Sequence, residues 1–225
     1  MRRAIKKSIF VALVLGVGVA AVSLLPPAGR LEASIFVTGN IPPGGIQQFS
    51  GPLGDDFTVT NNLKVTDFGV FDAGQDPLQS TITGYIYPLG GGTPLLTVTF
   101  SAGTSYANSP SPYVWQTLAT PLTLVAGQSY TLVAEGFGGA QPDSNTNNGS
   151  TVTFSQVGYT LDQSRFGYTP GLYPDLTPNN SGYPGNWHFG DANIEYIPEP
   201  LTIVIWSVLG VLAIGVGWWP RKRAA

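Results

Sequence analysis

The chain has 225 residues, a formal net charge of −3 and only 10% charged residues. It contains no cysteine, which excludes disulfide bonds, a thiol nucleophile and zinc sites built from cysteine. Its 29 glycines and 19 prolines are typical of short elements joined by turns rather than of long helices.

Residues 1–33 have the pattern of an export signal. Four basic residues precede an apolar run at residues 9–25: Arg2, Arg3, Lys6 and Lys7. A small residue stands at each of two plausible cleavage positions, so we expect cleavage after Ala33 or, alternatively, after Ala28. The mature chain then begins near Ser34, in an oxidising compartment.

The segment 34–197 is strongly acidic once the two ends are set aside. It keeps only Lys64 and Arg165 of the ten basic residues, but eleven of the thirteen acidic ones. Two positive against eleven negative charges leave a net charge of −9. Because such a surface repels phosphate backbones, we expect no nucleic acid partner. Divalent cations are the more natural counter-charge.

Short runs of alternating apolar and polar residues predict an all-β domain at 34–197, which is long enough for one core. The candidate strands are residues 57–59, 63–70, 82–87, 96–100, 113–118, 122–124, 129–134, 151–159 and 192–196. Two pairs look like hairpins, 82–87 with 96–100 and 122–124 with 129–134. Eight or more strands at this spacing indicate a jelly-roll-like antiparallel β-sandwich.

Two long breaks, at residues 136–150 and 169–186, predict surface loops, where binding residues are often found. The second loop could instead pack as a cover on a sheet edge. Tyr173, Tyr183 and Trp187 lie in or beside it, and aromatic rings of this kind stack on the faces of sugars. We therefore take these three residues as candidates for glycan binding.

Asp72 and Asp76 flank a glycine in one short loop. Calcium prefers clustered carboxylate and carbonyl oxygens, so the pair is a candidate calcium site. The spacing does not fit an EF-hand. The alternative is that both side chains only form turns by bonding to the local backbone.

His188 is the only histidine, so any Ser-His-Asp arrangement would have to use it. No G-x-S-x-G turn accompanies it, and we expect no catalytic role for this residue. A glycoside hydrolase needs only two carboxylates, but their pairing requires a geometry that the sequence does not supply. We therefore expect a protein that is not an enzyme, and keep a glycoside hydrolase as the third alternative.

The last 28 residues have three parts in order. Pro198, Glu199 and Pro200 come first, followed by nineteen residues without a charge at 201–219. A helix of that length is about 28 Å long, enough to span the hydrocarbon core of a membrane. A basic tail ends the chain and should stay in the cytoplasm: Arg221, Lys222 and Arg223. The prolines should keep the whole segment 198–200 out of helix and sheet, where a protease can reach it.

These three parts resemble the PEP-CTERM sorting signal of Gram-negative bacteria that make extracellular polysaccharide. The resemblance covers residues 197–223 and implies processing near the Pro-Glu-Pro motif by exosortase, a membrane protease-transpeptidase. It also implies a transient membrane anchor at 198–225, followed by release to the cell surface or matrix. The alternative is an ordinary anchor whose prolines merely end the last strand.

A second resemblance covers most of residues 55–135. The runs from Val65 to Asp72 and from Leu124 to Tyr130 are similar to a β-sandwich module of PEP-CTERM proteins that looks like galactose-binding-like domains. It implies no enzymatic activity. Taken together, the sequence predicts an exported structural protein associated with exopolysaccharide or biofilm. A calcium-assisted carbohydrate-binding module is the alternative.

Overall fold

The computed structural model describes residues 32–39, 47–72, 76–103, 112–138, 143–145, 152–177 and 188–199. Within these residues the chain forms strands and no helix, so the all-β prediction is confirmed. The signal segment up to residue 31, the apolar run 201–219 and the basic tail lie outside the described residues.

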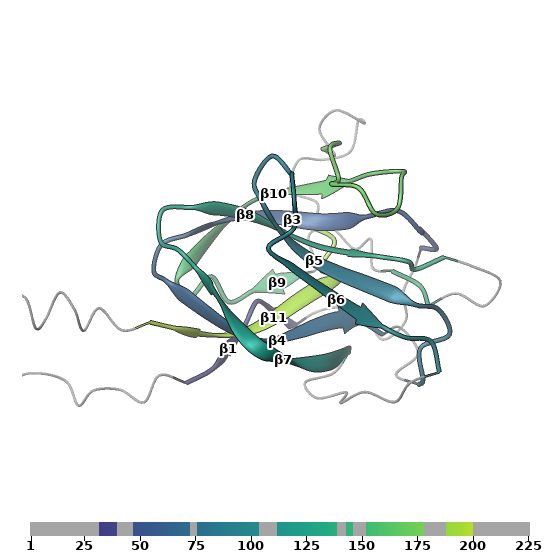
Figure 1. Cartoon of the computed structure of the whole chain (residues 1–225), viewed down its shortest axis with the longest axis horizontal. Coiled ribbons are helices and arrows are strands. Elements are labelled where there is room, and N and C mark those ends of the chain that lie inside the picture. The colour runs from purple at the N-terminus through teal and green to yellow at the C-terminus, as the bar shows by residue number, and fades with distance from the viewer. Residues whose placement is uncertain are drawn as a thin grey trace, which may run out of the picture. The chain divides into compact units, whose positions relative to one another are not determined.

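The strands form two antiparallel sheets that pack as a β-sandwich (Figure 1). One sheet has the order β1-β11-β4-β7 and the other β10-β3-β8-β5-β6, while β2 and β9 pair separately. The strands are β1 (Ser34–Ile35), β2 (Val37–Gly39), β3 (Leu53–Val59), β4 (Leu63–Phe71), β5 (Ile82–Pro88), β6 (Leu96–Phe100), β7 (Tyr113–Leu124), β8 (Ser129–Glu135), β9 (Thr153–Phe154), β10 (Tyr159–Phe166) and β11 (Ala192–Pro198).

Of the two predicted hairpins, one is confirmed and the other is wrong. Strands β5 and β6 pair directly, whereas β7 and β8 lie in different sheets. Leu124 of β7 is opposite Leu63, and Tyr130 of β8 is opposite Phe57. The turn between them crosses the sandwich, helped by Gly127, which adopts a φ of 79° and donates its N–H to the Val59 carbonyl at 2.7 Å. Both strands thereby turn apolar residues to one core.

Strand β10 is the longest element that the sequence pattern misses, together with the short strands β1 and β2. The predicted strand at 151–159 breaks after β9, where Gln156 and Gly158 have φ values of 51° and 80°, and β10 then continues to Phe166. Its polar residues conceal the strand because they bond to β3, as Arg165 does to Asp56. Strand β3 also begins earlier than predicted, so that Asp56 lies within a strand.

Aromatic rings fill the middle of the sandwich. The Phe36 ring stacks on Tyr159 with centroids 4.5 Å apart, and Phe57 meets Phe36 edge-on at 5.0 Å. All three side chains are buried. Such pairs add to the free energy gained by removing apolar surface from water. Stability therefore comes from packing, as the absence of cysteine requires.

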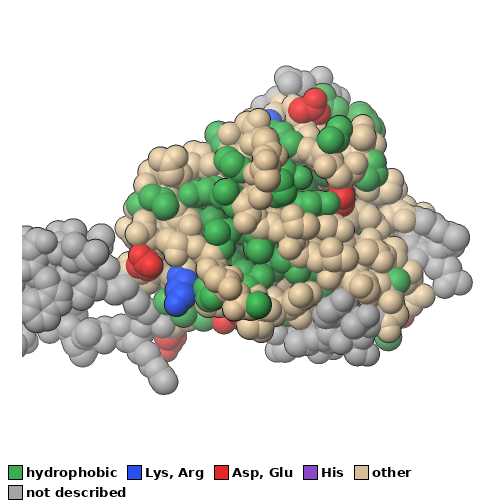
Figure 2. Space-filling view, viewed as in Figure 1, with side chains coloured by type: hydrophobic (Ala, Val, Ile, Leu, Met, Phe, Trp, Pro, Cys, Tyr) green, Lys and Arg blue, Asp and Glu red, His purple; other side chains and the backbone are tan. Residues whose placement is uncertain are grey.

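The sandwich has two ends that carry different chemistry. We call the end where β1 starts and β11 finishes the exit end, and it includes the turns 60–62, 125–128 and 156–158. We call the opposite end, where β4 and β8 finish and β5 starts, the far end. The exit end lies at the left of Figure 1. The face in view in Figure 2 carries many hydrophobic and few charged side chains.

Candidate metal centre and neighbouring clusters

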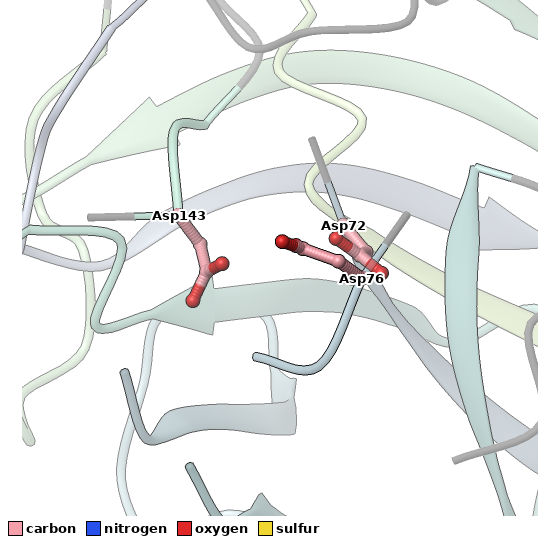
Figure 3. A group of neighbouring side chains, drawn as sticks. All are labelled: Asp72, Asp76 and Asp143. Atoms are coloured by element: carbon pink, nitrogen blue, oxygen red, sulfur yellow. The ribbon is translucent and has the colours of Figure 1, made fainter. Parts of the chain in front are cut away.

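Three carboxylates meet at the far end: Asp72, Asp76 and Asp143 (Figure 3). One oxygen from each lies within 4.8 Å of the others, although Asp143 is far along the chain from the other two. Asp72 and Asp143 are buried and Asp76 is exposed. Since Ca²⁺ holds its oxygens at about 2.4 Å, two ligands of one ion are at most about 4.8 Å apart. The spacing fits a cation of this kind.

Two parts of the fold bring the carboxylates together. Asp72 directly follows β4 and donates its N–H to the Pro112 carbonyl at 2.9 Å. Asp143 is held by the segment before β5, because its Oδ2 accepts bonds from the N–H groups of Gln79 and Ser80, both at 3.0 Å. The Ser80 hydroxyl donates to the same oxygen at 3.1 Å. The sequence placed Asp72 and Asp76 together but gave no sign of Asp143.

Among the described residues, neither Lys64 nor Arg165 forms a salt bridge with the three carboxylates. Arg165 donates from Nε to Asp56 Oδ2 at 2.6 Å. Lys64 lies near the start of β4, eight residues before Asp72, which is about 26 Å along a strand. Asp143 is already satisfied by its bonds to Gln79 and Ser80, so a missing partner does not define this site. The close approach of three carboxylate oxygens is what makes the cluster one that could hold a cation.

A second buried cluster joins Asp55, Ser164 and His188. The Ser164 hydroxyl donates to Asp55 Oδ1 at 2.8 Å, and His188 Nδ1 lies 3.0 Å from the same oxygen. Ser164 Oγ is also 3.2 Å from that Nδ1. A catalytic triad needs serine and aspartate on opposite nitrogens of the ring, but here both lie at Nδ1. Ser164 is also only 1% exposed, so the cluster lacks the geometry for acyl transfer.

The same cluster fixes the start of β11. The Gly190 N–H donates to Asp55 Oδ2 at 3.1 Å, and the Tyr113 hydroxyl donates to the Gly190 carbonyl at 2.6 Å. Burial raises the pKa of Tyr113, and the negative charges of Asp191 and Asp55 raise it further. Tyr113 therefore stays protonated as a donor. This arrangement gives Asp55 and His188 a role in holding the chain.

Tyr173 is anchored to the outer face of the five-stranded sheet. Its hydroxyl lies 2.9 Å from Thr131 Oγ1 and accepts the Gly90 N–H at 3.1 Å. The Tyr87 ring meets it edge-on at 5.4 Å, and the Arg165 guanidinium lies 5.4 Å from its ring centre. The described part of this loop, up to residue 177, therefore packs on the face of the sheet over β8 and β5. The other two candidates, Tyr183 and Trp187, lie outside the described residues.

A buried carboxylate attaches the same loop to the sheet. Glu135 Oε2 accepts the Gly171 N–H at 2.8 Å, while Oε1 accepts the Tyr85 hydroxyl at 2.8 Å. Burial and the adjacent Glu135 both raise the pKa of Tyr85, which therefore remains a donor at neutral pH. Glu135 was not singled out from the sequence, because nothing in its strand indicates that a loop folds over it.

The first two residues of the predicted sorting motif belong to the sandwich. Pro198 is the last residue of β11 and lies opposite Leu63, so the expectation that it stays out of the sheet is wrong. A proline is tolerated at this position because the last residue of a strand can lack the N–H that a residue within the strand would donate. The Glu199 N–H donates to the Asn62 carbonyl at 2.8 Å, and Asn62 Nδ2 donates to Glu199 Oε2 at 2.9 Å. Pro200 and the tail Arg221, Lys222 and Arg223 lie outside the described residues.

No helix among the described residues is long and apolar enough to cross a membrane. No family model matches the chain, and neither the curated proteins nor the solved structures contain a match to it.

Proposed function

We propose that this chain is an exported protein of a Gram-negative bacterium, sorted by an exosortase-type enzyme to the cell surface or extracellular matrix. The signal at 1–33, the helix at 201–219 and the basic tail belong to the proposal. One observation carries it: a Pro-Glu-Pro motif that begins at the last residue of β11 is followed in order by an uncharged run of nineteen residues and three basic residues. The sandwich then acts as a structural component associated with exopolysaccharide or biofilm.

We also propose that the sandwich is of the jelly-roll type. Strands β3 and β4, and again β7 and β8, are consecutive in the chain but lie in opposite sheets. Such crossings between two antiparallel sheets support this fold type. A domain of this kind has no need of disulfides in an oxidising compartment, since its core is built from buried aromatic side chains.

Peptide mapping of the form released from the producing cells tests the sorting proposal. The released chain should lack every peptide after Leu201, whereas the membrane fraction should retain the precursor. Detection of peptides containing Trp206 in the released form would contradict processing. A variant with Arg221, Lys222 and Arg223 replaced by glutamine should lose membrane retention or correct orientation, since basic residues set orientation.

A calcium-assisted carbohydrate-binding module is the second candidate. The observation that favours it is the meeting of Asp72, Asp76 and Asp143 within 4.8 Å, in a segment with only two basic residues. We propose that Ca²⁺ binds there, with an affinity on the order of 0.1–1 mM, the range of extracellular calcium modules. The ion would fix the far-end loops against a neutral sugar.

Calorimetric titration of the released protein separates the two candidates. Calcium should give saturable heat that Asp76→Asn reduces and Asp175→Asn leaves unchanged, because Asp175 is an exposed acid on a different loop. Saturable binding of the organism's exopolysaccharide that disappears with a chelator would establish the module. Absence of heat with both ligands would leave the structural component.

We infer no enzymatic activity. The cluster of Asp55, Ser164 and His188 does not have triad geometry, and the sequence contains no G-x-S-x-G turn. Asp67 and Glu195 face each other across β4 and β11 and are a carboxylate pair that a glycosidase could use. Turnover of matrix polysaccharide that Glu195→Gln abolishes would replace the binding proposal with a hydrolase.

A further inference from the structure

The connection between the sandwich and its C-terminal run is fixed at one asparagine. Asn62 binds Glu199 twice, through its backbone carbonyl at 2.8 Å and through its side-chain Nδ2 at 2.9 Å. Its Oδ1 accepts the Ala126 N–H at 2.9 Å. Asn62 therefore ties the end of β11 to two turns of the sandwich. We call this set of bonds the Asn62 clasp.

The clasp limits how far the sandwich can lie from the apolar run. Only Pro200 separates Glu199 from the run that starts at Leu201. Because consecutive Cα atoms are about 3.8 Å apart, the Cα atoms of Glu199 and Leu201 are at most about 7.6 Å apart. A connection this short, with one end held by hydrogen bonds, gives the sandwich little freedom to turn away.

The surface around the clasp has a composition suited to a lipid boundary. Val125 is 51% exposed and Val157 is 49% exposed. Val125 precedes Ala126 of the clasp, and the Val157 carbonyl accepts the Tyr196 hydroxyl at 2.9 Å, beside the end of β11. Lys64, an exposed residue and the only lysine of segment 34–197, lies opposite Ile197.

The two ends of the sandwich also differ in charge. The carboxylates of Asp72, Asp76 and Asp143 lie at the far end, away from the clasp. At the exit end the exposed carboxylate of Glu199 is balanced by the exposed Lys64. An anionic membrane therefore repels the exit end less than the far end. Exposed apolar side chains next to a lysine are the usual composition of a surface that rests in the headgroup region.

We propose that the exit end of the sandwich is a lipid-contacting surface. Val125 and Val157 enter the boundary between headgroups and acyl chains, Lys64 meets anionic headgroups, and the Asn62 clasp fixes this orientation. The inference rests on the membrane anchor in the proposed function. As a consequence, the far-end carboxylates point away from the membrane, toward the surrounding matrix.

Single-cysteine labelling tests the orientation, since the chain has no cysteine of its own. The full chain is placed in vesicles of phosphatidylethanolamine and phosphatidylglycerol and labelled with an environment-sensitive fluorophore at Val125→Cys or Val157→Cys. Tyr168→Cys is the matched control, because Tyr168 is 73% exposed and follows the opposite end of β10. Lipids with a headgroup nitroxide should quench the first two labels strongly and the control weakly.

The variant Asn62→Ala tests the clasp within the Val125→Cys chain. It should reduce quenching toward that of the control label, whereas Asn61→Ala should leave it unchanged, because Asn61 bonds Gly158 through its backbone N–H. Equal quenching at residues 125, 157 and 168 would overturn the proposed orientation while leaving the anchor intact. Failure of the unlabelled full chain to float with vesicles would overturn the anchor, and this inference with it.

Discussion

The exit end and the far end of the sandwich are closed in different ways. Short turns close the exit end, and backbone bonds such as Gly127 to Val59 and Glu199 to Asn62 fix them. At the far end, by contrast, buried carboxylates hold the chain: Asp143 binds the segment before β5, and Asp55 binds the start of β11. The exit end is closed by backbone bonds and by the side chain of Asn62, whereas the far end relies on several buried carboxylates.

This difference indicates which end can respond to its surroundings. A turn closed by neutral hydrogen bonds keeps its geometry over a wide range of pH and salt. A set of buried carboxylates changes with protonation or with the binding of a cation. We therefore expect the exit end to keep one conformation and the far end to change its conformation when a cation binds.

The largest loss of stability is expected from a substitution in the core, between the two ends of the sandwich. Phe36→Ala removes a buried ring that contacts both Tyr159 and Phe57. We expect the free energy of unfolding to fall by about 3–5 kcal/mol, as for other buried phenylalanines. Guanidinium denaturation of the purified chain measures it. Phe36→Leu should lose much less, and equal losses for both variants would show that the ring contacts matter little.

The next effect tests the dependence of the far end on Asp143. In a chelator, Asp143→Ala leaves three donors on Gln79 and Ser80 without their acceptor, which should cost about 2–3 kcal/mol. Asp143→Asn keeps an acceptor oxygen and should recover part of this stability. Neither variant should gain stability from added calcium as the parent chain does. An equal calcium response in all three chains would remove Asp143 from the metal site.

A smaller effect is expected at the exit end. Asn62→Ala removes the side-chain bonds to Glu199 and Ala126, both exposed to solvent, and should cost about 1 kcal/mol. Because Asn62 lies at the opposite end of the sandwich from the carboxylate cluster, added calcium should not change the loss. Thermal unfolding with calcium and with a chelator checks this. A loss that depends on calcium would break the distinction between the two ends.

The smallest effect concerns Glu195 on the outer face of the four-stranded sheet. Burial raises its pKa, and the neighbouring charge of Asp67 raises it further. A raised pKa means that the folded chain holds the proton more tightly than the unfolded chain. The stabilising contribution is therefore complete below the unfolded pKa, about 4.3, and is lost as the pH rises through the folded pKa.

Glu195→Gln should therefore raise the melting temperature at pH 7. It should have little effect near pH 3, because the carboxyl group is then protonated in both the folded and the unfolded chain. The gain should be only a few tenths of a kcal/mol, because the side chain is partly exposed and water screens its charge. Asp175→Asn, on an exposed loop, serves as the control. A gain of equal size at both pH values would show that the raised pKa is not its cause.

Much of the fold could be predicted from alternating residues alone. The runs that became β5 and β6 alternate clearly, since one face of each is buried in the core. Strand β8 was also found, although it is buried on both faces. Strand β10 could not be found in this way, because Arg165 and its polar neighbours are satisfied by partners on β3. The crossing between β7 and β8 was also hidden, since a tight turn with glycine looks the same within one sheet or between two.

The candidate site shows the same limit. Asp72 and Asp76 could be paired because they share a short loop, and a local feature needs no knowledge of the fold. Asp143 joins them only because the segment after β8 returns to the residues before β5. Tyr173 was selected for its place in a long loop, but its contacts with Thr131 and Arg165 depend on where that loop lies on the sheet.

The sequence by itself determined the all-β class, the acidic character of the segment 34–197 and the order of parts at its C-terminal end. These properties follow from composition and local periodicity, which are carried by neighbouring residues. Only the tertiary structure decided that Asp143 completes the carboxylate cluster and that Asn62 holds Glu199. Both depend on strands pairing across the sandwich, and such pairing is set by the burial of a shared core rather than by any one stretch of the chain.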